Sequence, residues 1–332
     1  MLPAIKDYLE EVRWHLHLDV VGEQQIIGEL YTHFQEKAAE LQRDGMDAED
    51  AAREAVRSCG RARELARLMY EAHSQGSWRE AALAALPHFT VAFLFALHLW
   101  RHIPVDALVF AVIVAVTLLG WWHGKPNWLY PWVGYALLPL LVTSYLLFPA
   151  LAQSFAYFVR GQGAPPGAGT LVVACLLPVA AVWITARTTV RVVRRDWILA
   201  SLMLVPIPVV GSWLATMVLT GGLAPGGAAE MSPWNTALAQ VLVVLGVTSA
   251  LFLRLRQRLL KVGALVTLGV IAFTLTGGIL WGHIGFFGFL LTALIALLYL
   301  LSPALLEARV GHESAGELSW GAEGLPHPSA SR

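Results

Sequence analysis

Four side chains near the N-terminal end have the residue types of metal ligands. They are spaced four, three and four residues apart, so one stripe of a helix would carry all of them: Glu29, His33, Glu36 and Glu40. This stripe lies almost opposite the apolar stripe of the same segment, and no second group of ligands is visible in the sequence. A solvated helix face has the same pattern. We therefore interpret these side chains as a surface and expect no metal site there.

The remaining sequence has none of the short motifs that mark catalytic or nucleotide sites. It contains no glycine loop ahead of a lysine, no paired-histidine zinc motif and no Gly-x-Ser-x-Gly turn. The two cysteines, Cys59 and Cys175, lie in a charged and in an apolar region, which argues against a disulfide framework. We expect no catalytic residue, no cofactor and no enzymatic activity.

The charged residues that any site would need are distributed very unevenly. The chain has 332 residues, of which 57% are hydrophobic and 14% charged, and its net charge is zero. Residues 1–80 hold 26 of the 46 charged side chains, whereas residues 81–306 contain three acids, Asp106, Asp196 and Glu230. The zero net charge argues against direct binding of nucleic acid. The uneven distribution predicts two regions that live in different solvents.

This division predicts an all-α protein in three parts. Residues 1–78 would form a small cytoplasmic helical bundle, and residues 79–305 a polytopic membrane domain. Residues 306–332 are rich in Gly, Ser, Pro and Glu, which is typical of a disordered tail.

Helical periodicity predicts four helices in the first part. They cover residues 3–18, residues 21–44, a segment capped at Asp47, and a segment that follows Gly60, with Gly45 as a left-handed end of the second. Each would bury one apolar face: Ile5, Leu9, Val12 and Leu16; Ile27, Leu30, Tyr31, Phe34, Ala38 and Leu41; Ala52, Ala55, Val56 and Cys59; Ala62, Leu65, Ala66 and Met69.

Apolar runs of about 20 residues predict about eight membrane spans in the second part. Backbone polar groups in lipid need internal partners, so we expect all of them to be helices. The predicted spans are 82–100, 104–122, 130–150, 168–187, 196–220, 233–253, 262–281 and 284–303.

Basic residues in the predicted loops orient these spans. The loops on one side carry nine: Lys125, Arg187, Arg191, Arg194, Arg195, Arg254, Arg256, Arg258 and Lys261. The loops on the other side carry Arg101 and Arg160. By the positive-inside rule, the nine basic residues are cytoplasmic. This predicts a multi-pass protein of the inner (plasma) membrane with both termini in the cytoplasm.

Three motifs in residues 1–75 resemble the HAAS-type signalling domain, also called the permease prefix domain. They are "YLEEVRWHL", "IIGELYTHFQEKAAEL" and "GMDAEDAAREAVRSCGRARELA". Arg61 departs from the family pattern, which has an acid after the glycine. The matching positions are Tyr8, Leu9, Glu11, Glu29, Leu30, His33, Phe34, Gly45, Met46, Ala51, Ala55, Gly60, Leu65 and Ala66.

The resemblance implies a regulatory or sensory role in which this region binds a protein partner. Such domains lie on the cytoplasmic side of bacterial membrane proteins, often encoded beside a PadR-like transcriptional regulator, and are not known as catalysts. The implied partner is a PadR-like regulator or another membrane protein, in addition to membrane lipid. We assign the partner contact to the exposed faces of the second and fourth helices, at Glu29, His33, Arg63 and Arg67.

A permease of small molecules or lipids is the alternative function. The stretch "VPIPVVGSW" at 205–213 interrupts the fifth predicted span with Pro206, Pro208 and Gly211, and interrupted helices can line a transport path. A kinked packing helix has the same residues, because Pro and Gly are common in membrane spans. Titratable candidates inside or beside the spans are His88, His98 and His283.

Overall fold

The computed structural model describes residues 2–18, 20–161, 167–219 and 232–310. All regular elements in these ranges are helices, which confirms the predicted all-α class. The chain divides into two compact units, the first ending at Tyr70 and the second covering Glu71–Arg309. Most of the predicted tail at 306–332 lies outside the described residues.

The helices of the first unit begin and end near the predicted positions. The Asp47 carboxylate accepts a hydrogen bond from the Glu49 backbone N–H, so it caps the third helix as predicted. Gly45 and Gly60 both adopt left-handed backbones, with φ of 95° and 81°. The bounds are α1 Pro3–Leu16, α2 Val20–Arg43, α3 Ala48–Ser58 and α4 Ala62–His73.

The predicted inner faces of these four helices are buried or half-buried in one hydrophobic cluster. Phe34 is fully buried at the centre and meets the Tyr8 ring edge-on, with ring centroids 5.4 Å apart. The Tyr8 hydroxyl donates to the Gly60 carbonyl at 3.2 Å and so fixes the α3–α4 turn against α1. A buried ion pair between Arg13 and Glu23, 2.9 Å long, joins α1 to α2. Sequence periodicity does not indicate either of these polar contacts.

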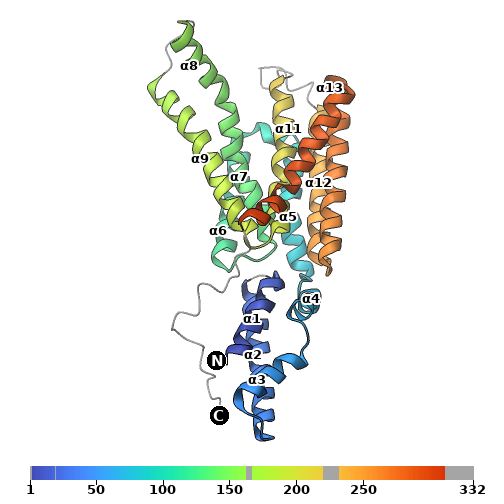
Figure 1. Ribbon diagram of the computed structural model, residues 1–332. Coiled ribbons are helices and arrows are strands. Elements are labelled where there is room, and N and C mark those ends of the chain that lie inside the picture. Colours follow the sequence, from blue (N-terminus) through green and yellow to red (C-terminus); the bar gives the residue numbers. More distant parts are fainter. Residues whose placement is uncertain (1, 19, 162–166, 220–231, 311–332) are drawn as a thin grey trace. The chain divides into compact units, whose positions relative to one another are not determined.

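The second unit holds the long apolar helices. Their bounds are α5 Trp78–Ala96, η1 Leu99–Arg101, α6 Ile103–Trp122, α7 Leu129–Leu146, α8 Phe148–Arg160, α9 Ala168–Val193, α10 Trp197–Leu204, α11 Pro206–Leu219, α12 Ser232–Arg254 and α13 Arg258–Val310. Figure 1 shows α12 beside α5, and α9 running alongside α7 and α8.

Six helical segments in the described residues are long and apolar enough to cross a membrane. They are Ile103–Trp122, Leu129–Arg160, Ala168–Val193, Trp197–Leu214, Trp234–Arg254 and Gly285–Arg309. They overlap six of the eight predicted spans, which supports a multi-pass membrane protein. The predicted spans 82–100 and 262–281 are not among them.

Two predicted boundaries differ clearly from the structure. The span predicted to end at residue 150 is followed by α8, which extends to Arg160. Pro149 lies in the first turn of α8, where a backbone N–H has no helical acceptor, so this proline does not stop the helix. The fourth predicted span, 168–187, continues to Val193. Its additional residues include Arg191, whose charge is typical of a loop between membrane spans.

The last helix, α13, turns back on itself at Gly285. This glycine has φ 62° and ψ −176°, a conformation that other residues rarely adopt. A Cβ atom on Gly269 would lie 2.8 Å from the Leu300 side chain, so the two halves of α13 pack against each other. Figure 1 shows the orange and red halves running side by side. The predicted spans 262–281 and 284–303 correspond to these two halves.

Candidate functional site

The segment between α4 and α5 is bonded to the end of α12. The Gly76 backbone N–H donates to the Leu253 carbonyl at 2.8 Å. This carbonyl belongs to the last turn of α12, where helical carbonyls have no partner of their own. A Cβ atom on Gly76 would lie 3.2 Å from the Glu80 carboxylate and 3.4 Å from the Leu253 carbonyl oxygen. A glycine at position 76 therefore allows the close approach.

Side chains from both segments complete what we call the linker clamp, formed by Ser74, Gln75, Gly76, Leu253, Arg254, Arg256 and Lys261. The Ser74 hydroxyl donates to the Arg256 carbonyl at 2.8 Å, and the Arg256 guanidinium donates to the Gln75 side chain at 2.8 Å. The Arg254 guanidinium donates to the Gly76 carbonyl at 2.9 Å. Hydrogen bonds of this kind that involve a charged group contribute about 1.5–3 kcal/mol each.

Lys261 is the buried member of the linker clamp. Its ammonium donates to the Ser74 carbonyl at 3.3 Å, and the residue is 3% exposed. Burial lowers the pKa of Lys261 to about 8, an effect that the Asp196 carboxylate opposes and the Arg258 guanidinium reinforces. Lys261 lies in the first turn of α13, ahead of the predicted span.

The helix that follows the clamp has a defined first turn. The Ser77 hydroxyl accepts from the Glu80 backbone N–H at 3.2 Å, and the Glu80 carboxylate accepts from the Ser77 backbone N–H at 2.7 Å. This capping box fixes the start of α5 directly beside the clamp. The Arg254 guanidinium also lies 4.4 Å from the centre of the exposed Trp78 ring.

An ion pair continues the network from the clamp to α10. The Arg258 guanidinium lies 3.1 Å from the Asp196 carboxylate, which is nearly fully buried. The same Asp196 oxygen accepts from the Ile198 backbone N–H and so caps α10. In turn, the Ser201 hydroxyl of α10 donates to the Leu300 carbonyl of α13 at 3.0 Å. These contacts join α10 to both halves of α13.

The predicted grouping of basic loops is found at this end of the second unit. The Arg195 guanidinium donates to the Lys125 carbonyl at 3.1 Å, which joins the α6–α7 loop to the end of α9. Asp196 follows directly and pairs with Arg258 of the third basic segment. The three basic segments therefore lie at the same end of the helices, as the charge pattern predicts.

A second polar cluster lies among the apolar helices. The His88 ring contacts the Tyr135 hydroxyl at 2.8 Å through Nδ1 and the Ser249 hydroxyl at 2.9 Å through Nε2. All three residues are at most 2% exposed and come from α5, α7 and α12. Of the other predicted histidines, His98 has a left-handed backbone before η1, and the His283 side chain lies outside the described residues.

The four predicted partner residues are all solvent-exposed. Glu29 and His33 lie on α2, and Arg63 and Arg67 lie on α4. Glu29 accepts from Gln25 one helical turn earlier. That the four side chains bind a partner together stays a prediction.

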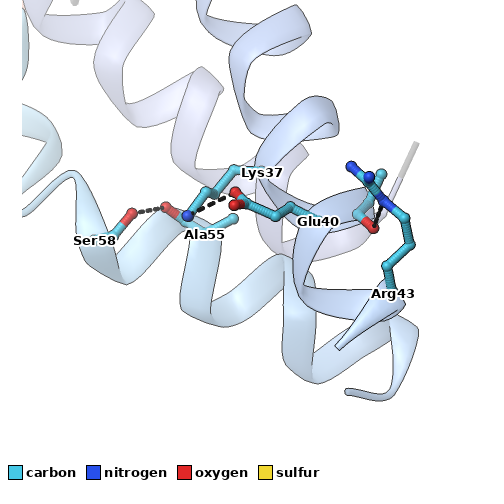
Figure 2. Close-up of polar contacts among 6 residues, drawn as sticks. Lys37, Glu40, Arg43, Ala55 and Ser58 are labelled. Atoms are coloured by element: carbon cyan, nitrogen blue, oxygen red, sulfur yellow. Dashed lines mark hydrogen bonds and ion pairs between the residues drawn. The ribbon is translucent and has the colours of Figure 1, made fainter. Parts of the chain in front are cut away.

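The polar contacts at the nearby ends of α2 and α3 are equally local. Figure 2 shows Lys37 paired with Glu40 at 2.8 Å and Ser58 bonded to the Ala55 carbonyl, each within its own helix. The pairing with Glu40 raises the pKa of Lys37. Exposed pairs of this kind add little stability, so the surface is built from solvated side chains.

At the predicted interruption of the fifth span, the prolines remove backbone hydrogen bonds, but the backbone stays helical. Between α10 and α11, Val205 keeps helical angles of φ −53° and ψ −40°. Pro208 leaves the Leu204 carbonyl without its helical donor, and the Tyr299 hydroxyl lies 3.5 Å from that oxygen. Pro206 is buried, whereas Gly211 is exposed with nothing near its missing Cβ. A transport path at these residues stays a prediction.

Comparison with known proteins does not assign a family or a function to this chain. No family model, no curated protein and no solved structure matches the chain. Within the described ranges, no three His, Cys, Asp or Glu side chains are grouped so that they could hold a metal ion. The linker clamp is therefore the candidate site, and the sequence did not indicate it because its partners are about 180 residues apart.

Proposed function

We propose that this chain is a regulatory membrane protein of a bacterial inner membrane, whose N-terminal helices bind a protein partner. The linker clamp is the observation that carries the proposal. It bonds the residues after α4 to the Leu253 carbonyl and to the Arg254 guanidinium at the end of α12, which supports a coupling of α4 to the helices of the second unit. The resemblance of residues 1–75 to the HAAS-type domain supports a partner such as a PadR-like regulator.

The proposed topology has eight spans and both termini in the cytoplasm. The six apolar segments would provide six of the eight spans, and α5 and the first half of α13 would provide the other two. The shared end of the three basic segments supports this arrangement, since an odd number of crossings would separate them. Cysteine-accessibility labelling in intact cells tests it: single cysteines at Gln75 and Gln257 should react only after the membrane is opened.

Partner binding is testable with the full-length protein in membranes of its source organism. A photo-crosslinking amino acid is placed at His33 or at Arg67, and the adduct is identified by mass spectrometry. We expect both positions to capture the same protein. Arg57 of α3 is the matched control, because its side chain is exposed on a different helix.

Two results would overturn this assignment. One is the absence of an adduct at both His33 and Arg67. The other is an identical set of adducts at Arg57, which would indicate random collision. Transmission through the clamp is measured separately by hydrogen exchange at residues 253–261, which should change when the captured partner is added to the parent. The change should be smaller in the variant Ser74→Ala.

A permease of small molecules or lipids is the second candidate, and the buried cluster around His88 favours it. Polar side chains inside a membrane domain are costly and often mark a path for substrate or protons. Flux into proteoliposomes should then fall in His88→Leu and in the Pro206→Ala/Pro208→Ala double variant. Unchanged flux in both, or no flux in the parent over a broad substrate screen, argues against transport.

A further inference from the structure

A second group of cations lies at the basic end of the second unit, apart from the linker clamp. We call it the basic corner: Lys125 and the nearby Arg191 and Arg195, with the aromatic rings of Trp121 and Tyr130. The Lys125 ammonium lies 4.7 Å and the Arg191 guanidinium 6.0 Å from the Trp121 ring centre. The Arg195 guanidinium donates to the Tyr130 hydroxyl at 2.9 Å. The corner is formed where α6, α7 and α9 meet.

The two basic groups differ in how their charges are satisfied. In and beside the linker clamp, each cation has an oxygen acceptor from the protein: Arg254, Arg256, Arg258 and Lys261. In the basic corner, Lys125 and Arg191 lie against an aromatic ring, without an oxygen acceptor among the described residues. Arg195 uses one guanidinium nitrogen twice, while its buried Nη2 has no hydrogen-bond partner there.

Negative charge from the protein does not compensate this corner. No carboxylate in the described part of the chain forms an ion pair with Lys125, Arg191 or Arg195. The neighbouring Asp196 is committed to Arg258 and to the start of α10. The pKa of Lys125 is lowered by burial and then by the Arg195 and Arg191 charges, so its nearest charged neighbours are cations. Three like charges held together in this way favour an external anion.

We propose that the basic corner binds the phosphate of an anionic phospholipid headgroup. Arginine donates to phosphate oxygens through paired N–H groups, and basic pockets between membrane helices bind anionic headgroups. Leu118 and Leu119, on the last turn of α6 before Trp121, are 48% and 52% exposed and offer an apolar surface to the acyl chains. A free phosphate ion would use the same cations but not this surface.

The test uses the full-length protein purified in a neutral detergent. Thermal stability is titrated with dioleoyl phosphatidylglycerol, with dioleoyl phosphatidylcholine and with inorganic phosphate. We expect phosphatidylglycerol to raise the unfolding midpoint of the parent, with little effect from the other two. In Lys125→Gln/Arg191→Gln the apparent affinity for phosphatidylglycerol should fall about 30-fold, because each basic residue near the surface contributes about one kcal/mol.

Two further variants separate this site from general charge effects. Arg79→Gln/Arg187→Gln removes two exposed charges that belong neither to the basic corner nor to the linker clamp, and it should keep most of the affinity. Lys125→Arg/Arg191→Lys keeps both charges and should bind nearly as the parent, which distinguishes lost binding from a misfolded variant. An equal loss in the Arg79→Gln/Arg187→Gln variant, or an equal response to inorganic phosphate, would overturn the proposal.

Discussion

The indole N–H of Trp132 donates to the Leu83 carbonyl at 2.8 Å, and this carbonyl is the one that Pro87 leaves without a helical donor. Pro87 lies inside α5, where its missing N–H would otherwise expose a buried acceptor in an apolar environment. Trp132 comes from α7 and is 3% exposed. A proline in one helix is thus matched by a donor from its neighbour.

This relationship predicts a double-mutant cycle. Trp132→Phe should lower the free energy of unfolding by about 1–2 kcal/mol, from the unpaired carbonyl and from lost packing. Pro87→Ala restores the N–H at position 87, so the same Trp132→Phe change should cost less in that background. Reversible unfolding in a mixed detergent measures both steps. Equal costs in the two backgrounds would show that Trp132 does not serve the Leu83 carbonyl.

Any side chain in place of Gly134 in α7 should cause a severe steric clash. A Cβ atom there would overlap the carbonyl oxygen of Met203 in α10, which cannot move as a side chain can. We expect Gly134→Ala to lower the free energy of unfolding by about 2–3 kcal/mol. Gly263→Ala is the control, because a Cβ atom at Gly263 has no neighbour within 4 Å, and it should leave stability unchanged or slightly higher. Similar losses in both would contradict close α7–α10 packing.

Removal of the Ser74 hydroxyl from the linker clamp should have a local effect on the segment it bonds. Ser74→Ala removes the hydrogen bond to the Arg256 carbonyl, so backbone amides at 253–258 should exchange faster with solvent. Ser58→Ala is the matched control, since the Ser58 hydroxyl bonds only one turn back within α3. Hydrogen exchange with mass spectrometry resolves the two segments. Unchanged exchange at 253–258 in Ser74→Ala would show that the loop is held by other contacts.

The buried Lys261 should make the stability of the protein depend on pH in a defined direction. Its folded pKa is about 8, because burial penalises the ammonium, whereas an unfolded lysine holds its proton to about pH 10.4. Between these values the unfolded chain binds more protons, so stability rises with pH and is lost as pH falls through 8. The thermal midpoint of the parent should therefore rise relative to Lys261→Met from about pH 8 to 10. Parallel curves for the two proteins would contradict the burial of this charge.

The sequence predicted local features of this fold well. Asp47, Gly45 and Gly60 act within a few residues of themselves, and the structure has each in its predicted role. The inner faces of α1–α4 follow from the 3.6-residue period in the same way. Hydropathy also located most of the apolar helices, because length and composition are local properties.

Relationships between distant residues were not predictable from these patterns. Gly76 and Leu253 carry no sign of each other in the sequence, although a backbone hydrogen bond joins them. The sequence pattern also gives no sign that Trp132 donates to the Leu83 carbonyl, which Pro87 leaves without a helical donor. The four proposed partner residues depend on a molecule that is not in the chain, so neither periodicity nor packing tests them.

The connection between α4 and α5 is short. His73 ends one helix and Trp78 starts the next, and the linker clamp and the capping box engage all of the residues between them. A long flexible tether reports a bound partner only through local concentration. The connection between α4 and α5 is too short to act as such a tether, because each of its residues can span at most about 3.6 Å. A movement at His73, the last residue of α4, would therefore strain the hydrogen bonds that tie this connection to the end of α12.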